Sequence, residues 1–311
     1  MSDAHTTPPM RNGVTASKVH LPKQAHATSI YSFLCQKFEH ISAIEWQQRF
    51  ADGLILDANG QVLSIEQNYQ TQQHIFYYRH LAKEVVVPFK HEILFENDHL
   101  MVVDKPHFLT MSPTGQYVQE TLLVRLKQQT HNPKLTPIHR LDRETAGVVL
   151  FSKQPETRGL YQNLFAQHLV QKTYHAIAAF SPTLKLPCTT SFKMEKGQPF
   201  YTMQIVQGEP NSETQIELLE HNTIWAKYQL QPKTGKQHQL RVHLSALGVP
   251  ILNDPLYPLV CHKAENDFSQ PLQLLAASIH FVDPITQQLM EFFSQQSLHL
   301  PLQCNDNELT K

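Results

Sequence analysis

Long hydrophobic runs are missing from this sequence of 311 residues. The longest stretches without Asp, Glu, Lys or Arg are mixed with Gln, Ser and His, so none supplies the roughly 18 consecutive apolar residues of a membrane-spanning helix. Residues 1–20 also lack the apolar segment of a secretory signal peptide. We therefore expect a soluble protein that resides in the cytoplasm.

Cysteines are few, and they lie far apart in the sequence. Because the four cysteines form no C-x-x-C pair, neither a zinc ribbon nor a disulfide framework is indicated. We expect reduced thiols at all of these positions: Cys35, Cys188, Cys261 and Cys304.

The net charge is also small, because 26 Lys and Arg residues stand against 27 Asp and Glu residues. This balance argues against a uniformly cationic nucleic-acid-binding protein. The charge is nevertheless uneven, since residues 122–243 hold 15 basic and 8 acidic residues, a net charge of +7. This segment fits an anionic partner, although a solvated basic face explains the same pattern equally well.

The length predicts about two domains, at roughly 100 to 200 residues each. Residues 1–26 are polar and lack hydrophobic periodicity, which predicts a flexible N-terminal arm. The chain from residue 27 onward has the periodic apolar residues of folded structure.

Residues 27–87 are predicted to form a small helix-helix-hairpin module. Apolar residues at i, i+3, i+4 and i+8 from Ile30 predict a first helix, and the capping box at 42–45 begins a second helix. Asn59-Gly60 between apolar residues predicts a hairpin with a type I′ turn.

Residues 88–300 are predicted to form the second domain, followed by a C-terminal tail at 301–311. Strands outnumber helices there and are joined mostly by short polar turns, so we predict a mixed, largely antiparallel α+β domain. The expected strands are 93–95, 100–103, 148–151, 174–180, 214–219, 224–231 and 272–282, and the expected helices are 118–129, 155–168 and 237–247.

A first cluster of charges lies at 137–147, between an apolar entry and an apolar strand. Asp142 stands between Arg140 and Arg143, and nearby positive charge favours the ionised form of a carboxyl group. Gly147 permits a sharp turn that would present Asp142 at the mouth of the strand. An ionised carboxylate there suits a nucleophile or a base, and a surface loop of salt bridges is the alternative of equal weight.

A second cluster, at 234–244, has the pattern of a turn that leads into a helix. His238 and Arg241 share one helix face, so they favour an anionic neighbour such as phosphate or Asp142. A metal site at His238 and His243 is disfavoured, because an i, i+5 pair is poor geometry and no acidic or Cys partner is close in sequence. Tyr174 enters a strand, from which its phenol could reach the mouth of the site.

Together, these segments resemble the RluA family of pseudouridine synthases over about residues 90–295. The helix-helix-hairpin at 28–65 is similar to the small RNA-binding domain that many members carry. The matching motifs are His139-Arg140-Leu141-Asp142 with Thr145 and Gly147 (H-R-L-D-x-x-T-S-G), Lys172-Thr173-Tyr174 (K-x-Y), Thr234 to His243 (T-G-x-x-H-Q-I/L-R-V-H), Val103-Asp104-Lys105-Pro106 (D/N-K-P) and Asn253-Asp254-Pro255-Leu256-Tyr257 (G-D-x-x-Y).

This resemblance implies a pseudouridine-synthase fold and the isomerisation of uridine in RNA, with no cofactor and no metal. It implies that Asp142 is the essential nucleophile or base, that Arg241 pairs with Asp142, and that Tyr174 stacks on the uracil and is a candidate base for C5. It also implies that Arg140 enters the helical stack as the target base is extruded. The other expected RNA contacts are His139, which is expected mainly to support the loop, Arg143, Lys172, Lys236 and His238.

Three positions depart from the family pattern, namely Ala146 for Ser, Asn253 for Gly, and Gln237 for Thr or Arg. They favour the alternative of a catalytically silent RNA-binding or ribosome-assembly factor, which the intact catalytic motifs disfavour. A metal-dependent RNA hydrolase built on the histidines is a further alternative. We expect a monomer that acts on ribosomal RNA, with transfer RNA as the other candidate substrate.

Overall fold

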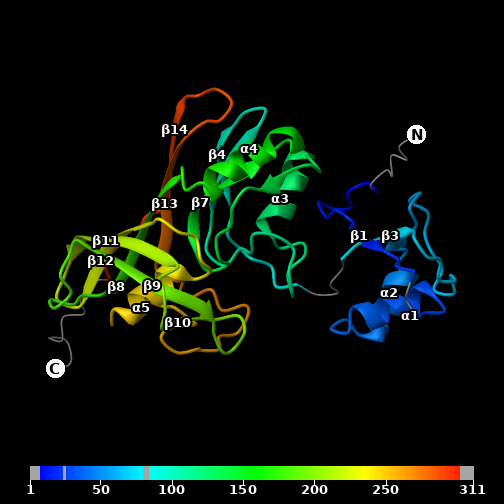
Figure 1. The fold of residues 1–311 in the computed structure, drawn as a ribbon, viewed down its shortest axis with the longest axis horizontal. Helices are drawn as coiled ribbons and strands as arrows, with labels where there is room; N and C mark the ends of the chain where they lie inside the picture. The colour runs from blue at the N-terminus through cyan, green and yellow to red at the C-terminus, as the bar shows by residue number, and fades with distance from the viewer. Residues whose placement is uncertain (1–7, 24–25, 80–83, 302–311) are drawn as a thin grey trace, which may run out of the picture. The chain divides into compact units, whose positions relative to one another are not determined.

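The computed structural model describes residues 8–23, 26–79 and 84–301, and it divides into two compact units (Figure 1). We call them the N-terminal unit, residues 1–84 with 112–133, and the sheet unit, residues 85–111 with 134–311. The predicted tail lies almost entirely outside the described residues. Among the described residues, no helix has both the length and the apolar character needed to cross a membrane.

The two predicted helices of the N-terminal unit are confirmed as α1, Ile30–Lys37, and α2, Ala43–Ala51. Helix α2 begins with a reciprocal cap, since the Glu45 backbone N–H donates to Ser42 Oγ (3.2 Å) and the Ser42 N–H donates to Glu45 Oε2 (3.0 Å). Such a cap satisfies two helix-terminal donors that would otherwise lack partners, which is why this helix begins where the sequence predicts.

The N-terminal unit also contains an antiparallel sheet in the order β1-β3-β2. Its strands are β1, Ser17–His20, β2, Ile55–Leu56, and β3, His74–Tyr77. The prediction of a flexible arm is therefore wrong for residues 8–23. Val19 and Leu21 are buried among the core side chains of α1 and α2. Strand β1 is only 4 residues long and pairs with a strand more than 50 residues away, so it leaves little local signal.

The turn at Asn59-Gly60 differs from the predicted type. A type I′ turn needs positive φ at both residues, but only Gly60 has it, at +81°. The Asp57 carboxylate instead accepts hydrogen bonds from the backbone N–H groups of Asn59 and Gln61, both at 2.8 Å. The loop is thus held by an Asp side chain and closed by one left-handed glycine.

Helix α3, Leu122–Thr130, belongs to the N-terminal unit and not to the sheet unit. Its Lys127 Nζ donates to Thr15 Oγ1 at 2.8 Å, and its Val124 packs with Val14. The predicted contiguous boundary at residue 87 is therefore incorrect, because residues 112–133 interrupt the sequence of the sheet unit and fold with the N-terminal segment.

Within the described residues, the sheet unit is built on one sheet of eleven strands (Figure 1). The strand order is β10-β9-β11-β12-β8-β13-β7-β5-β4, with β14 beside β13 and β6 beside β7, and only the β13–β7 pair is parallel. The predicted mixed, largely antiparallel α+β fold is confirmed. The strands are β4 Glu92–Glu96, β5 Leu100–Lys105, β6 Thr136–Pro137, β7 Ala146–Ser152, β8 Gln171–Ala179, β9 Cys188–Lys196, β10 Met203–Val206, β11 Ser212–His221, β12 Trp225–Pro232, β13 Leu274–Val282 and β14 Leu289–Phe293.

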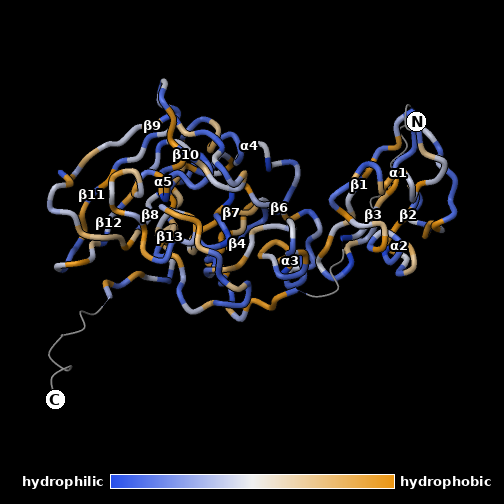
Figure 2. Tube along the Cα trace, turned by 90° about the horizontal axis from the view of Figure 1, so that it is seen from below, coloured by the Kyte–Doolittle hydropathy of each residue, from blue (hydrophilic) through white to orange (hydrophobic). Residues whose placement is uncertain are grey.

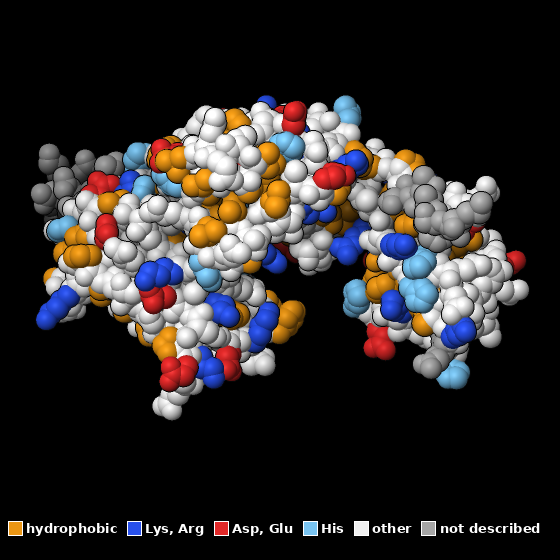
Figure 3. Space-filling model, turned by 45° about the horizontal axis from the view of Figure 1, so that its top comes forward, with side chains coloured by type: hydrophobic (Ala, Val, Ile, Leu, Met, Phe, Trp, Pro, Cys, Tyr) orange, Lys and Arg blue, Asp and Glu red, His pale blue; other side chains and the backbone are white. Residues whose placement is uncertain are grey.

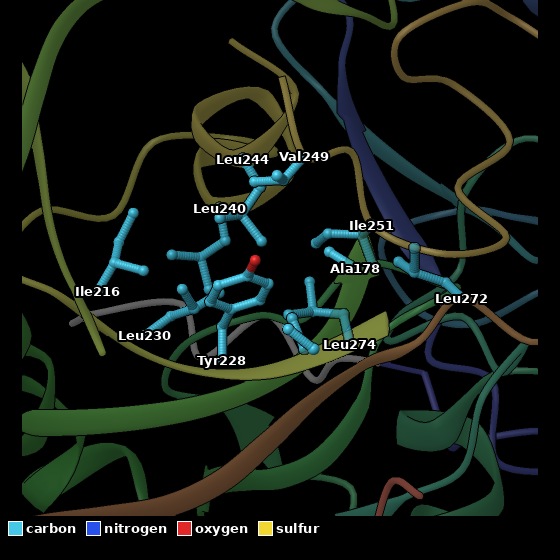
Figure 4. Packing of buried hydrophobic residues seen from close by; sticks show 12 residues of the cluster. Ala178, Ile216, Tyr228, Leu230, Leu240, Leu244, Val249, Ile251, Leu272 and Leu274 are labelled. Atoms are coloured by element: carbon cyan, nitrogen blue, oxygen red, sulfur yellow. The ribbon is translucent and has the colours of Figure 1, made fainter. Parts of the chain in front are cut away.

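Helix α5, Gln239–Ala246, lies on one face of this sheet above a hydrophobic core. Leu240 and Leu244 point from α5 toward Tyr228 and Leu230 of β12 (Figure 4). Each fully buried leucine contributes roughly 1.5–3 kcal/mol. This packing holds α5 on the sheet and so fixes the direction of its polar face. Figure 2 shows how hydrophobic and hydrophilic stretches alternate along the chain of this unit.

Helix α4, Pro155–Ala166, is confirmed and begins with proline in its first turn. Four strands of the sheet unit were not predicted, namely β6, β9, β10 and β14. Strands β10 and β14 lie at the edges of the pairing and are mostly half-exposed. Both are short and mostly apolar without a regular alternation of apolar and polar residues, which explains why the pattern did not reveal them.

Gly147 shapes the path into the candidate site, as predicted. Its φ is +112°, and a Cβ at this position would lie 2.2 Å from the Ala276 carbonyl oxygen. The glycine therefore allows β7 to approach the parallel strand β13 at the place where the charged loop enters the sheet.

Candidate active site

The two charged clusters meet at one cavity of about 640 Å³ in the sheet unit. Its walls come from the loop 139–142, the start of β8, and the segment 234–241 that leads into α5. These segments are separated by up to about 100 residues in the sequence, and the sheet brings their polar ends together. We call Asp142, Tyr174, His238 and Arg241 the floor of this cavity, and we call the exposed Arg140 and Lys236 its rim.

Asp142 lies on the floor beside two nitrogen-bearing side chains. Arg241 Nη1 lies 3.5 Å from Asp142 Oδ2, and His238 Nε2 lies 3.8 Å from the same oxygen. The Asp142 side chain is 22% exposed, so a substrate can reach its carboxylate, whereas the Arg241 side chain is only 1% exposed. His238 and Arg241 thus face the same carboxylate, but the predicted shared helix face is wrong, because His238 is the N-cap residue before α5.

Arg241 has a second carboxylate partner that the sequence prediction did not include among the site residues. Its Nε and Nη2 donate to the two oxygens of Asp254 at 2.8 and 2.6 Å, and the Asp254 side chain is completely buried. Arg241 Nη1 has no hydrogen-bond acceptor within the described residues. The bidentate pair therefore fixes the guanidinium group and leaves one N–H edge directed toward Asp142. The G-D-x-x-Y resemblance was the signal that pointed to Asp254.

Tyr257, from the same segment, supports His238. The Tyr257 hydroxyl accepts the Met203 backbone N–H at 2.8 Å and lies 2.8 Å from His238 Nδ1. Where this hydroxyl donates to Nδ1, the Nε2 of a neutral imidazole carries the hydrogen toward Asp142. Burial lowers the pKa of His238, which favours this neutral form near pH 7.

His238 also has an unusual backbone conformation. His238 is the N-cap of α5 with a φ of 54°, a left-handed conformation that is uncommon for residues other than glycine. Such conformations persist where surrounding contacts hold them, and they are frequent at functional sites.

Tyr174 lines the same cavity from β8. Burial, and then the charge of Asp142, raise the pKa of Tyr174 well above its ordinary value. The side chain is therefore a phenol and not a phenolate at neutral pH. Its neighbour Lys172 is half-buried and donates to the Thr234 carbonyl at 3.4 Å, and burial lowers the pKa of Lys172.

Lys105 supports the loop that carries Asp142, and the prediction did not assign it to the site. Its Nζ donates to the carbonyl oxygens of Pro106, Leu109 and Arg143 at 3.0, 2.9 and 3.1 Å. Lys105 is fully buried, and this burial lowers its pKa to about 7, with the charges of Glu144 and Asp142 acting in the opposite direction. Three carbonyl acceptors for three ammonium hydrogens hold the loop directly after Asp142 in place.

His139 also supports this loop, in agreement with the main role predicted for it. Its Nε2 accepts the backbone N–H of Leu150 at 3.1 Å, and its ring stacks on Phe165 with centroids 4.6 Å apart. Burial lowers the pKa of His139 to about 3, so it is neutral at pH 7. Its ring faces the protein on both of these sides, although it contributes to the cavity wall.

The remaining predicted RNA contacts divide into two groups. Arg140 and Lys236 line the cavity and are exposed, and neither side chain makes a hydrogen bond or ion pair to any described residue. Arg143 is different, because it pairs with Glu144 at 3.3 Å, donates to the Glu265 carbonyl and lies over the Phe108 ring. Arg143 does not line the cavity, so it is engaged within the protein.

The described residues contain no group of three or more His, Cys, Asp or Glu side chains arranged to hold a metal ion. The expectation of a reaction without metal or cofactor stays a prediction. Cys35, Cys188 and Cys261 are free thiols, while Cys304 lies outside the described residues. What the floor offers chemically is one accessible carboxylate beside an arginine and a neutral histidine, in a partly desolvated cavity.

Residues 99–246 match the protein family described as RNA pseudouridylate synthase. An uncharacterized RNA pseudouridine synthase of Synechocystis is 29% identical over 248 residues, which cover 75% of this chain and 82% of that protein. The dual-specificity RNA pseudouridine synthase RluA of Vibrio vulnificus is 32% identical over 216 residues, which cover 65% of this chain and 82% of that protein.

A solved structure shares the fold. The human protein RNA pseudouridylate synthase domain containing 1 superposes with a TM-score of 0.54 at 24% identity, covering 70% of this chain and 92% of the human chain. At this identity the likeness concerns the fold, which agrees with the sheet described above.

Proposed function

Because the chain belongs to the RluA family of RNA pseudouridine synthases, we propose that it isomerises specific uridines in structured RNA and that the reaction depends on Asp142. The main support is the floor of the cavity, where an accessible carboxylate lies 3.5 Å from Arg241 and 3.8 Å from His238. A carboxylate in this position is within reach of a substrate and lies beside a buried cation.

The chemistry moves a base without adding or removing any atom. The bond from C1′ to N1 breaks, the uracil turns, C5 bonds to C1′, and the proton on C5 is transferred to N1 in the overall balance. The Asp142 carboxylate acts either by attack at C1′ or by taking a proton from the ribose. In both routes Arg241 and the Nε2–H of His238 stabilise the carboxylate, and this electrostatic preorganisation costs no rearrangement during the reaction.

We propose that Tyr174 packs against the uracil. Its raised pKa argues against the predicted role as the base that removes the C5 proton, because a phenol must lose its own proton before it accepts another. A buried phenol is nevertheless a good flat surface for a pyrimidine, and its position in the cavity wall supports this role.

Reaching the floor requires the target nucleotide to leave its stack. Unstacking costs a few kcal/mol, and a side chain that fills the gap offsets part of that cost. We propose that Arg140 is this side chain, since it is exposed at the rim and has no partner within the described residues. Lys236 and Lys172 would contact phosphates near the target, which orients RNA without specifying sequence. The internal contacts of Arg143 make it a less suitable RNA ligand.

We propose that the N-terminal unit also binds RNA. The unit, residues 1–84 with 112–133, holds nine basic and eight acidic residues, a net charge of +1, and three of the cations line one groove beside β1. This groove is lined by Lys18, Lys37 and Arg79 together with Phe38 and Tyr77, and no acidic side chain of the described residues lines it. A locally cationic groove suits the RNA backbone even where the whole unit is nearly neutral.

The decisive experiment is tritium release from RNA labelled at uridine C5, prepared from cells that lack this gene. Wild-type protein is compared with Asp142→Asn in the presence of EDTA, and the length of the RNA is followed in parallel. Release by the wild type alone, from RNA that stays full length, is the expected result. A drop of about 10⁴-fold or more in Asp142→Asn is the size expected when an essential catalytic group is removed.

The same assay, run separately on ribosomal and transfer RNA, decides the substrate. We propose structured ribosomal RNA first, and the dual-specificity name of the Vibrio relative is the reason to test both. If neither RNA loses tritium although salt-sensitive binding persists, the isomerase proposal fails and a silent RNA-binding factor replaces it. Shortened RNA that depends on a metal would instead indicate a hydrolase.

A further inference from the structure

The hairpin formed by β9 and β10 presents an aromatic side chain to solvent next to the active site. Phe200, at its tip, is 77% exposed, more than any other large hydrophobic residue in the described part of the chain. Single exposed apolar residues are ordinary on protein surfaces, so exposure alone has no functional meaning. Three further observations distinguish this residue.

First, the tip is held rigidly. The Gly197 N–H donates to the Thr202 carbonyl at 3.0 Å, and both the N–H and the Oγ1 of Thr202 donate to the Pro199 carbonyl at 2.8 and 2.7 Å. These bonds close the turn from both sides. Phe200 is therefore displayed on a fixed loop, which reduces the entropy lost when a ligand binds to it.

Second, hydrogen bonds connect the hairpin to residues of the cavity. Gln237 lines the cavity, and it donates to the Tyr201 carbonyl at 3.5 Å while its Oε1 accepts from Lys196 Nζ at 3.2 Å. At the base of the hairpin, the Met203 N–H donates to the Tyr257 hydroxyl, which contacts His238. The tip thus lies directly beside the segment that borders Asp142.

Third, exposed cations lie near the tip. Lys196 ends β9, four residues before Phe200, and donates to Gln237, while Lys236 precedes Gln237 in the sequence. The acidic residue of β9, Glu195, is paired with Lys193 at 3.1 Å. On the face drawn in Figure 3, exposed hydrophobic side chains and Lys or Arg side chains of the sheet unit lie side by side. An exposed aromatic ring with cations nearby is the combination that binds an unstacked nucleobase and its phosphates.

We propose that Phe200 is a stacking platform for a nucleobase that flanks the target uridine, with Lys196 and Lys236 contacting the adjacent phosphates. This subsite rests on the proposed function, since the ligand is the same RNA. It binds a base next to the target and takes no part in the bond changes. Because stacking accepts any base, the subsite contributes affinity and register and little sequence preference.

Kinetics with four Phe200 variants tests this subsite. We expect Phe200→Ala and Phe200→Leu to raise KM for RNA about 5- to 100-fold, the range of one base stack, with kcat within about 2-fold. Phe200→Tyr and Phe200→Trp should have a KM close to that of the wild type, because both side chains keep an aromatic face. Leu289→Ala, which removes a 65% exposed side chain from the distant strand β14, should change nothing. A wild-type KM in Phe200→Leu would overturn the proposal, since it would show that an aromatic ring is not needed.

A binding measurement makes the result independent of catalysis. In Phe200→Trp, RNA should quench the fluorescence of the added tryptophan, after subtraction of the wild-type signal from Trp46 and Trp225. Quenching supports stacking even if the wild type releases no tritium, and in that case only the proposed function fails. Tritium release without such quenching sinks the subsite and leaves the isomerase intact. A Phe200 variant that loses affinity for a protein, with RNA affinity unchanged, would make the tip a protein-docking site instead.

Discussion

The floor and the rim of the cavity contain the same kinds of cation in opposite environments. On the floor, Arg241 is 1% exposed and makes two short hydrogen bonds to Asp254. At the rim, Arg140 and Lys236 are exposed and contact no acidic side chain in the described residues. The guanidinium group of Arg241 therefore positions carboxylates on the floor, whereas the cations at the rim remain available for phosphate.

This difference has an energetic consequence. Removing one partner of a buried ion pair costs about 3–5 kcal/mol, because the other charge stays desolvated. An exposed cation contributes about 1 kcal/mol or less to the folded state. Changes on the floor should therefore alter stability and kcat together, while changes at the rim should alter KM and its dependence on salt.

The largest effect should follow from Asp254→Asn. Arg241 would lose the carboxylate that fixes it, so we expect the free energy of unfolding to fall by about 3–5 kcal/mol and kcat to fall about 100-fold or more. Urea unfolding and tritium release measure the two effects. Asp267→Asn is the matched control, because that carboxylate is half-exposed and accepts hydrogen bonds from the backbone N–H and the hydroxyl of Ser269 in its own turn. Equal stability of the two variants would contradict the buried-pair argument.

Acid should destabilise the fold through its buried histidines. Burial lowers the pKa of His139 to about 3 and that of His243 to about 4, while both titrate near 6.5 when unfolded. Between pH 6.5 and 4 the unfolded chain binds more protons, so stability falls as the pH falls, by about 1.4 kcal/mol per pH unit for each histidine. The two together remove about 4 kcal/mol between pH 6.5 and 5.

Thermal unfolding of wild type and His243→Gln between pH 6.5 and 5 separates the contribution of His243 to this loss of stability from that of His139. His243 Nε2 contacts Ser212 Oγ at 2.9 Å, and a glutamine amide can keep that hydrogen bond without titrating. The variant should lose about 1.4 kcal/mol per pH unit of the acid dependence. Parallel curves for the two proteins would show that the pKa of His243 is the same in the folded and the unfolded chain.

Arg140→Ala should separate base extrusion from binding. If the side chain fills the stack, its loss should reduce kcat/KM about 10- to 100-fold on a stem-loop substrate, the equivalent of a few kcal/mol of unstacking. A short unstructured oligonucleotide needs no unstacking and should be affected much less. The same loss on both substrates would leave Arg140 as a plain phosphate contact.

The smallest effect is expected for Lys236→Ala. The variant should weaken RNA binding several-fold on every sequence and reduce the slope of log K against log salt by about 1, with kcat unchanged. Lys134→Ala removes another exposed lysine of the sheet unit that does not line the cavity, and it should leave the slope unaltered. An unchanged slope in Lys236→Ala would remove this residue from the RNA-binding surface.

Elements that depend on neighbouring residues were predictable. Three such features appear where the sequence predicts them. They are the capping box of Ser42 and Glu45, the positive φ of Gly147 and the apolar face of helix α5. A cap, a glycine conformation and a helix periodicity each involve residues within a few positions of one another. The motif residues Asp142 and Arg241 also meet as the family resemblance implies.

Elements that depend on distant partners were missed. Strand β1 exists because it pairs with β3, and residues 112–133 fold with the N-terminal segment through contacts such as Lys127 to Thr15. Neither segment is distinctive by itself. A short half-buried strand and an amphipathic helix fit many surfaces, and which surface they cover depends on the rest of the fold.

The residue types of the site, their motifs and the family could all be inferred from the order of amino acids alone, because each motif is short and contiguous. The separate roles of these residues could not be inferred in this way. Burial separates Arg241, which holds Asp254, from Arg140, which stays available at the rim, and it makes His139 a neutral support. Desolvation and partner geometry are properties of the packed chain, so a side chain acquires its role only when the sheet has brought its neighbours together.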